Sequence, residues 1–493
     1  MSGVSRRSFV GLLGAALSGA ALPEMAVTET QYAATMRKNT AGHRPHIVVM
    51  ICDDIGSGDL GCYGSKLQTP NLDRMAAEGM RFTHYDTVHP ICSAARAAVM
   101  TGRYANRNGN QGVYLPTSQD GLSLDEVTIA NVLHDAKYTS MCVGKWHLGH
   151  LPEYLPTSRG FDAYFGVPYS VDMRPLPLIE DKHIVEAETD RAMLTPRYTD
   201  AAVKFIEKSA HADEPFFLYV AYSYPHIPIA ASRQFKGKSA HGIYGDAVEE
   251  IDWSVGEILN ALKQRGLDEN TLVMFTGDHG PWYQGSTGDR LGRKGSSYEG
   301  GCRVPMIARW KGTIPASQIC NSWATHLDLM PTLVALAGAK LPEQSLDGRD
   351  MSPLLTGAQE LERTGPVLYF SSLKGYAFQC ARQGKWKLRV AQWTKETYML
   401  GRDAGENLAL VKPELYDLES DPGESYNVAE SHPEIVKAIS ATLYRQIMTF
   451  PEHVVNTYNT MKSHPASVTT PAGSQARLAS YVALPRHYDA VDN

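Results

Sequence analysis

Short apolar runs rich in β-branched and aromatic residues alternate along this chain with longer stretches in which apolar residues recur every three or four positions. The first pattern is typical of buried strands and the second of amphipathic helices, so their alternation predicts an α/β fold. The clearest helix is predicted at residues 246–263. The clearest strands are predicted at 47–51, 139–143, 216–222 and 272–276.

Each of these four strands runs into a group of polar residues. In chain order the groups are Asp53-Asp54, Lys145-Trp146-His147, Tyr224-Pro225-His226 and Asp278-His279. Ligands of open α/β sheets bind beyond the carboxyl ends of the strands. The pattern therefore predicts that the four groups form one shared site.

The pattern changes after about residue 360. Short strands are predicted at 367–370, 377–382 and 386–390, and a late helix at 433–448. Beyond Pro451 the sequence is polar and without a periodic pattern, which predicts an extended tail. We therefore expect a main domain at 46–360 and a smaller α+β subdomain with its tail at 361–493.

The N-terminus has the features of a targeting segment. Arg6 and Arg7 precede an apolar run over residues 11–22, which resembles a twin-arginine export signal. The run is shorter than the roughly 20 apolar residues that span a bilayer, which argues against the alternative of a membrane anchor. We expect residues 1–26 to be a signal peptide and the mature protein to lie, free of the membrane, in the periplasm or outside the cell.

Composition narrows the classes of function. The 493 residues are 43% hydrophobic and 20% charged, as in soluble proteins of two domains. A formal net charge of −6 argues against nucleic acid as a partner, because that function needs a concentrated basic surface. The seven cysteines show no CxxC spacing, which argues against a zinc site or a disulfide framework.

Asp53 and Asp54 are candidate metal ligands. Adjacent carboxylates repel each other unless a cation lies between them. Asp278 follows another apolar strand and could complete the all-oxygen site that Ca²⁺ or Mg²⁺ prefers. The alternative for each aspartate is a helix cap or a turn.

Cys92 is a candidate nucleophile. It begins a stretch of high helix propensity, residues 92–100, and the N-terminus of a helix together with the nearby Arg96 is expected to favour the thiolate. The alternative is a buried structural cysteine. The residues around Cys92 decide between these interpretations.

Cys92-x-Ala94-x-Arg96, followed by Thr101-Gly102-Arg103, resembles the signature of the sulfatase family, in which the cysteine is oxidised to Cα-formylglycine. Further motifs are similar to those of the family and stand in its order: Asp53-Asp54, Gly144-Lys145-Trp146-His147-Leu148-Gly149, Pro225-His226-Ile227-Pro228, Gly277-Asp278-His279-Gly280 and Lys294-Gly295-x-x-Tyr298-Glu299-Gly300-Gly301. The resemblance covers residues 46–305, and residues 415–418 and 421–424 resemble a turn of the family's C-terminal domain.

The resemblance implies an alkaline-phosphatase-like α/β/α sandwich with a large mixed sheet and a smaller C-terminal α+β domain. It also implies hydrolysis of sulfate esters, as in arylsulfatases, by a formylglycine hydrate made from Cys92. It further implies one divalent cation, Ca²⁺, and a maturing enzyme as a partner. The ligands of the cation would be Asp53, Asp54, Asp278 and His279.

The resemblance assigns the other site residues as well. Lys145 and Lys294 would pair with sulfate oxygens, and Arg96 would hold the hydrate. His226 would protonate the leaving alcohol, and His147 would take a proton from the second hydroxyl of the hydrate. For each lysine or histidine taken alone, the alternative is a solvated surface side chain.

Three positions depart from the family pattern or have a second interpretation. Ala94 stands where many sulfatases have proline, which resembles sequences matured by an oxygen-independent radical enzyme, so the maturing enzyme stays open. His279 replaces an asparagine ligand, and imidazole suits Ca²⁺ less well, so it could contact the sulfate instead. Ser170 resembles a substrate-side position of arylsulfatases, but Pro-Tyr-Ser is also an ordinary turn, and we leave it out of the predicted site.

Two other functions remain as alternatives. A phosphoester or phosphonate ester hydrolase could use the same fold, although phosphate monoesters usually require two metals and the sequence offers carboxylates for one. A glycan-binding pseudoenzyme would result if Cys92 stayed a thiol. Export, the second domain and the aromatic residues Trp282, Tyr283 and Trp393 favour a sulfated carbohydrate as the substrate, with an aryl sulfate as the alternative.

Overall fold

A computed structural model of the protein describes residues 44–463, except for 110–111, 359, 362, 372–376 and 394–405. The expected signal peptide at 1–26 and the part of the expected tail beyond residue 463 lie outside the described residues. Among the described helices, none combines the length and the apolar character that a bilayer span requires.

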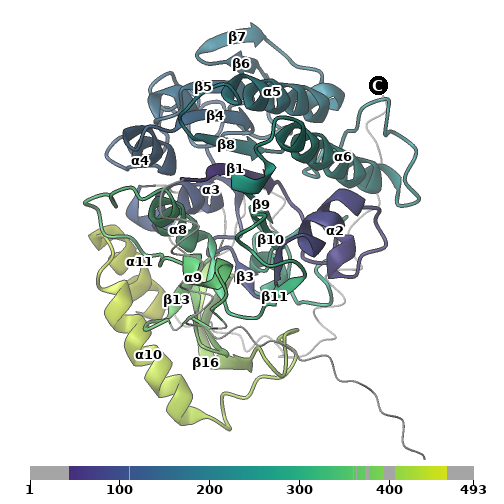
Figure 1. Ribbon diagram of the computed structural model, residues 1–493. Coiled ribbons are helices and arrows are strands. Elements are labelled where there is room, and N and C mark those ends of the chain that lie inside the picture. Colours follow the sequence, from purple (N-terminus) through teal and green to yellow (C-terminus); the bar gives the residue numbers. More distant parts are fainter. Residues whose placement is uncertain are drawn as a thin grey trace, which may run out of the picture.

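A ten-stranded mixed sheet forms the centre of the molecule (Figure 1). Its four central strands, in the order β9-β1-β8-β4, are parallel and are the four that the sequence predicts most clearly. They span β9 (Thr271–Gly277), β1 (His46–Cys52), β8 (Phe216–Ala221) and β4 (Thr139–Gly144). The flanking strands are β11 (Gln318–Cys320), β2 (Met80–Phe82) and β10 (Met306–Arg309) on one side, and β5 (Ala163–Gly166), β6 (Leu178–Glu180) and β7 (His183–Glu186) on the other.

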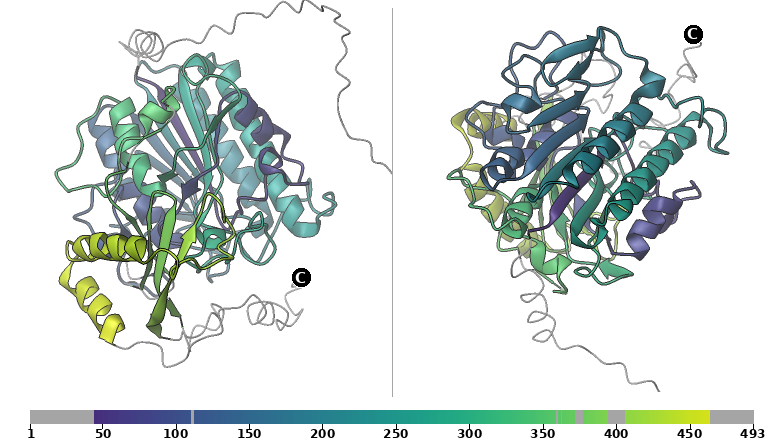
Figure 2. Two further views of the ribbon diagram at one scale, coloured as in Figure 1. Left: turned by 90° about the horizontal axis from the view of Figure 1, so that it is seen from below. Right: turned by 45° about the horizontal axis from the view of Figure 1, so that its top comes forward.

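Helices cover both faces of this sheet, because successive side chains of its central strands point to opposite faces and both sets are apolar. Val49 belongs to the buried hydrophobic cluster on one face of the sheet, and the next residue, Met50, belongs to the cluster on the other face. The first face is covered by α3 (Cys92–Thr101), α4 (Ile129–Asp135) and α8 (Leu329–Leu336). The second is covered by α2 (Pro70–Ala77), α5 (Leu194–Ser209) and α6 (Gly242–Gln264), and α5 and α6 lie side by side across the sheet in the right view of Figure 2. The helix predicted at 246–263 is thus confirmed within α6.

A smaller antiparallel sheet follows in the C-terminal part of the chain. It contains β13 (Val367–Phe370), β14 (Phe378–Gln383), β15 (Trp386–Trp393) and β16 (Asn407–Asp417), in that order, and α10 (Pro433–Ile447) packs on it (Figure 2). Three of these strands and α10 match the predicted elements. Two α-helices of a single turn are α7 (Glu299–Cys302) and α9 (Ser352–Leu355), and β3 (Tyr85–Asp86) pairs with β12 (Ala324–Thr325).

The smaller sheet shares a hydrophobic core with the main body. Phe370 of β13 belongs to the same buried cluster as Val88 and Tyr104, which come from the first part of the chain. The predicted α/β sandwich with a large mixed sheet and a smaller C-terminal α+β unit is therefore confirmed. The two parts are packed together directly, so contacts from the smaller sheet can reach loops of the larger one.

The expectation of an extended tail directly after Pro451 was wrong. Residues 452–463 form the helix α11 (Glu452–Ser463). Its buried residues Val454, Tyr458 and Met461 recur at spacings of four and three, and the Tyr458 ring lies 5.8 Å from that of Phe378. Polar residues between them hide this narrow apolar stripe in the sequence, and the helix is stabilised by packing on the sheet.

Candidate active site

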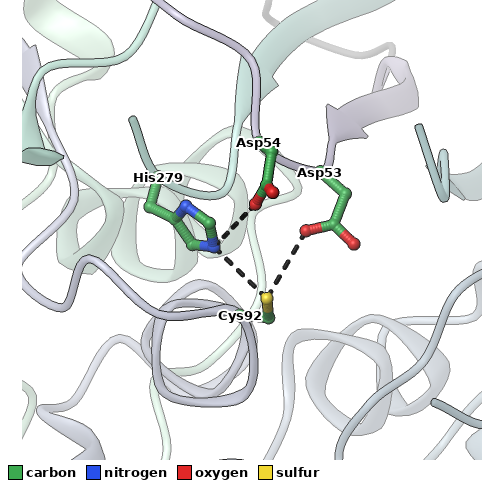
Figure 3. Close-up of side chains that lie close together, drawn as sticks. All are labelled: Asp53, Asp54, Cys92 and His279. Atoms are coloured by element: carbon green, nitrogen blue, oxygen red, sulfur yellow. Dashed lines mark hydrogen bonds and ion pairs between the residues drawn. The ribbon is translucent and has the colours of Figure 1, made fainter. Parts of the chain in front are cut away.

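The four polar groups meet at the carboxyl ends of the central strands, as the sequence predicts. Hydrogen bonds of the main chain continue beyond the strands and hold these ends in register: the N–H of Asp53 donates to the Tyr224 carbonyl at 3.2 Å, and that of Asp278 to the Cys52 carbonyl at 2.9 Å. Asp54 has a φ of 66°, in the left-handed region. In a strand, successive side chains point to opposite faces of the sheet. Because the chain turns at Asp54, the side chains of Asp53 and Asp54 instead both point toward Cys92 (Figure 3).

Cys92 begins helix α3, which is buried along all ten of its residues. The sulfur lies 3.5 Å from Oδ1 of Asp53 and 3.3 Å from Nε2 of His279 (Figure 3). Two of the predicted metal ligands are therefore in direct contact with the predicted nucleophile. Residues from three separate parts of the chain meet at this point.

The expectation that this environment favours the thiolate was wrong. Burial, followed by the negative charge of Asp53, raises the pKa of the Cys92 thiol. The ammonium groups of Lys145 and Lys294 act in the opposite direction without outweighing burial, and the Arg96 guanidinium donates to the Lys145 carbonyl at 2.9 Å and to Oδ2 of Asp278 at 3.1 Å. The unmodified thiol is thus protonated and a poor nucleophile at neutral pH.

Each predicted site histidine has one ring nitrogen at a main-chain carbonyl. Nδ1 of His279 lies 3.0 Å from the Gly280 oxygen, Nδ1 of His226 contacts its neighbour Ile227, and Nε2 of His147 lies 3.1 Å from the Tyr114 oxygen. A carbonyl only accepts hydrogen bonds, so these nitrogens carry the hydrogen. The other ring nitrogen of each neutral histidine is therefore free to accept a proton or to bind a cation.

Burial keeps these histidines neutral. It is the largest cause that lowers the pKa of His279, to about 3, and of His147, well below its usual value. It also lowers the pKa of His226, and the Lys294 ammonium adds to that effect. His147 is buried close to Lys145, whose charge contributes to lowering its pKa, and its backbone has a φ of 59°.

The three predicted cationic residues are buried and paired with the aspartates. The Lys294 ammonium lies 2.7 Å from Oδ1 of Asp54, and that of Lys145 donates to Asp53. Burial alone would raise the pKa of Asp53, but the Lys145 ammonium leads the neighbouring charges that hold it well below its usual value. Buried cations of this kind require such partners.

Ser170, which was left out of the predicted site, is part of it. Its hydroxyl lies 3.0 Å from the Lys145 ammonium and 3.4 Å from Nε2 of His226. It therefore links the groups that follow β4 and β8. The family resemblance was the available signal for this residue, and the turn-forming Pro-Tyr-Ser sequence concealed it.

The site fits a divalent cation. Ligand atoms of Asp53, Asp54, Cys92 and His279 all lie within 4.8 Å of one another. Oδ2 of Asp54 is buried without a hydrogen-bond partner, which leaves a carboxylate oxygen available. Carboxylate oxygens are the preferred ligands of Ca²⁺ and Mg²⁺.

The fourth predicted ligand, Asp278, adjoins this group. Its Oδ1 lies 3.5 Å from Nε2 of His279 and accepts the main-chain N–H groups of Asp54 and His279. Burial, followed by the charge of Asp53, raises the pKa of Asp278 to about 8. A carboxylate so disfavoured in its charged form gains from a nearby cation.

Comparison with known proteins gives the same result. Residues 45–339 match the model of the sulfatase family, and residues 291–452 match the C-terminal model of N-sulphoglucosamine sulphohydrolase. N-acetylgalactosamine-6-sulfatase of Mus musculus is 38% identical over 444 residues, which cover 81% of this chain and 84% of that protein. Arylsulfatase A of Homo sapiens is 38% identical over 439 residues, covering 80% and 86%.

Among solved structures, the PsFucS1 sulfatase from Pseudoalteromonas sp. is similar, with a TM-score of 0.77 and 27% identity over 88% of this chain and 95% of that chain. The fold is thus the alkaline-phosphatase-like fold that sulfatases share. Sequence motifs, strand-end geometry and relatives agree in one assignment. The chain belongs to the sulfatase family and is a sulfuric ester hydrolase.

Proposed function

We propose that this sulfatase hydrolyses sulfate esters of a carbohydrate, with a nucleophile made from Cys92 and one Ca²⁺. The observation that carries the proposal is the contact of Cys92 with Asp53 and His279 at a group of ligand atoms lying within 4.8 Å of one another. Oxidised to formylglycine and hydrated, position 92 would supply a hydroxyl as the nucleophile. Bound Ca²⁺ would act as a Lewis acid toward sulfate oxygens.

The protein's own residues would hold and polarise the sulfate. Asp53, Asp54, Asp278 and His279 are the proposed cation ligands. Lys145 and Lys294 bring buried ammonium groups to the two aspartates beside Cys92, and such preorganised charges are worth about 3 kcal/mol each in the transition state. Ser170, through its contact with Lys145, would fix that ammonium, and Arg96 would hold position 92 in place through Asp278 and the Lys145 carbonyl.

Two histidines would move the protons. His226, whose Nε2 lies 3.4 Å from Ser170, would first take up a proton at Nε2 when the negatively charged sulfate ester binds, and would pass that proton to the leaving alcohol oxygen as the sulfur–oxygen bond breaks. His147, whose Nε2 is held by the Tyr114 carbonyl, would accept a proton at Nδ1, which is buried without a hydrogen-bond partner. Loss of that proton from the second hydroxyl at position 92 would expel sulfate.

A sulfated sugar is favoured as the substrate class. The mouse relative is named for the 6-sulfate of N-acetylgalactosamine, and the loop after His279 carries Trp282 and Tyr283 in edge contact, with Tyr283 40% exposed. Exposed aromatic rings suit the apolar faces of sugars. An aryl sulfate remains the second candidate, because the human relative is an arylsulfatase.

The alternative of a two-metal phosphoester hydrolase finds little support. Within the described part of the chain, a single group of acidic, histidine and cysteine ligands is arranged to hold a metal ion. The pseudoenzyme alternative requires an unmodified thiol at position 92.

We further propose export through the N-terminal twin-arginine segment, maturation by an enzyme that accepts Ala94, a catalytic domain at 46–360 and a C-terminal subdomain at 361–493.

The test is sulfate release by matured enzyme across sulfated oligosaccharides and aryl sulfates, with matched phosphoesters as controls. We expect turnover of at least one sulfated oligosaccharide to exceed that of aryl sulfates in kcat/KM. Reaction of phosphoesters alone would refute the proposal. Turnover of aryl sulfates alone would retain the sulfatase chemistry and replace the substrate class.

A further inference from the structure

Lys294 lies in the last part of the long connection between β9 and α7, and we call residues 294–298 the lysine loop. On its inner side the loop is tied to the site: the Lys294 N–H donates to the Pro281 carbonyl at 3.1 Å, and the Gly295 N–H to the Pro90 carbonyl at 2.8 Å. Pro90 leads into Cys92 and Pro281 follows His279. The loop is therefore in contact with both segments that carry the central residues of the site.

On its outer side the lysine loop is held by the C-terminal sheet. The Ser371 hydroxyl donates to the Gly295 carbonyl at 2.6 Å, and the Ser297 hydroxyl donates to Oε1 of Gln379 at 2.6 Å. Arg389, on strand β15, donates from Nη1 to the Ser297 hydroxyl at 2.8 Å. Contacts from the residue after β13, from β14 and from β15 thus meet one five-residue loop.

Arg389 makes the most extensive of these contacts. Its guanidinium lies 3.5 Å from the centre of the Tyr298 ring, and its Nε donates to Glu414 at 3.2 Å. The Tyr298 hydroxyl reaches the same carboxylate at 3.3 Å, and Arg389 is only 2% exposed. The planar, rigid guanidinium therefore fixes two consecutive loop residues, which a flexible lysine could not do.

The loop needs such support from outside. Gly295 has a φ of 84°, a conformation that glycine adopts readily and that the local sequence does not enforce. The position of the Lys294 ammonium depends on where this backbone lies, and a misplacement of about 1 Å in a catalytic group can cost about 100-fold in rate. A remote residue that sets the backbone can therefore influence the reaction.

We propose that Arg389 is a positioning residue for Lys294. Through Arg389, the C-terminal sheet fixes the position of the Lys294 ammonium that binds sulfate. The inference rests on the proposed role of Lys294 in sulfate binding. It extends that function, because it makes the smaller sheet part of the catalytic apparatus rather than only a partner in folding. Its action passes through Ser297 and Tyr298 to the lysine loop.

The test is a double-mutant cycle on kcat/KM with Arg389→Lys and Lys294→Ala. We expect Arg389→Lys to lower kcat/KM by about 10- to 100-fold in the wild-type background. In the Lys294→Ala background we expect it to change kcat/KM by less than about twofold, because its route of action is already lost. Inhibition by inorganic sulfate should weaken in both single variants.

Arg382→Lys is the matched control. Arg382 is a buried arginine of the neighbouring strand β14 that stacks on Trp323 at 4.1 Å and binds Asp86 at 3.2 Å, and these partners lie outside the lysine loop. It tests the same loss of a stacked guanidinium from the same sheet. We expect a similar fall in the melting temperature and a change in kcat/KM below about twofold.

The outcomes are separable. Equal losses from Arg389→Lys in both backgrounds, or no loss at all, would overturn the inference and leave the proposed function intact. Full activity of Lys294→Ala would overturn the role of Lys294 and the inference with it. Should Arg389→Lys fail to fold, Ser297→Ala removes the link to Arg389 and Gln379 with a smaller perturbation, and the same coupling with Lys294→Ala is expected.

Discussion

Nε2 of His279 lies 3.3 Å from the sulfur of Cys92, and the same nitrogen lies 3.5 Å from Oδ1 of Asp54. Because Nδ1 of His279 faces the Gly280 carbonyl, the lone pair of Nε2 is directed at both groups. The position proposed for modification and the proposed cation ligands are thus one continuous cluster. Changes in either part are expected to affect the other.

Replacement of Cys92 by alanine should abolish turnover without unfolding the protein. We expect kcat/KM for an aryl sulfate to fall by at least about 10⁴-fold, because the nucleophile is lost and no neighbouring group replaces it. Sulfate release and the melting temperature are the measurements. Mass spectrometry of the peptide that contains Cys92 should show an aldehyde in active wild-type enzyme.

Cys142→Ala provides the matched control for this prediction. Cys142 is another fully buried cysteine, on strand β4. Its loss should lower stability by about 1 to 3 kcal/mol through the cavity left behind, while activity is retained. Full turnover by Cys92→Ala would end the proposed mechanism.

Asp53→Ala should lose the cation and activity together. The carboxylate contacts both Lys145 and Cys92, so we expect at least about a 100-fold fall in kcat/KM and a loss of bound calcium measured by elemental analysis. Chelation of wild-type enzyme should lower activity and the melting temperature, and added Ca²⁺ should restore both. Asp252→Asn, which alters a buried aspartate of α6 that accepts main-chain N–H groups at the start of α2, should keep its calcium.

The roles of His226 and His147 should be distinguishable by how the rate of each alanine variant depends on the leaving group of the substrate. His226→Ala is expected to slow alkyl sulfates by about 10² to 10⁴-fold and aryl sulfates with acidic phenols much less, because good leaving groups need no proton. His147→Ala should give a rapid first turnover and a slow steady state with all substrates. The reverse pattern would exchange the two assignments.

Stability should fall in acid because buried histidines are neutral in the folded protein. Burial lowers the pKa of His89 to about 3, whereas an unfolded chain binds the proton below about pH 6.5. Between these values the unfolded state binds more protons, so this contribution to stability is present above pH 6.5 and is lost as the pH falls. The loss is at most about 1.4 kcal/mol per pH unit for one histidine.

His89→Gln tests this effect through the pH dependence rather than through stability itself. The amide oxygen of glutamine can accept the Ala105 N–H that lies 3.2 Å from Nε2 of His89. The free energy of unfolding, measured in denaturant from pH 7 to pH 4.5, should depend less steeply on pH in this variant. His134→Gln, at a side chain that is 57% exposed, should leave the slope unchanged, and equal slopes in all three proteins would contradict the prediction.

The central sheet could be predicted because its strands leave a local signal. The run at 47–51 is apolar on both faces and ends in charged residues, so it marks both a buried parallel strand and the edge where ligands bind. The Asp53-Asp54 pair and Asp278 could be found for the same reason. Their proximity follows from the parallel order of β9 and β1.

Other features depend on contacts that no local pattern records. Ser170 belongs to the site only because β4 and β8 bring Lys145 and His226 to it. The raised pKa of the Cys92 thiol follows from burial beside Asp53, 39 positions away in the chain. The link from Arg389 to Ser297 crosses 92 positions, and neither residue has a neighbour in sequence that would indicate it.

Complete burial of helix α3 has a consequence for biosynthesis. Cys92 is 2% exposed, and its neighbours along the helix are equally enclosed, so a maturing enzyme has no access to it once the protein has folded. The proposed oxidation must therefore precede folding, on the newly made chain. If export follows the twin-arginine route, whose passengers fold before they cross, both events belong to the cytoplasm. The cell that makes this protein would then decide its activity before the protein leaves.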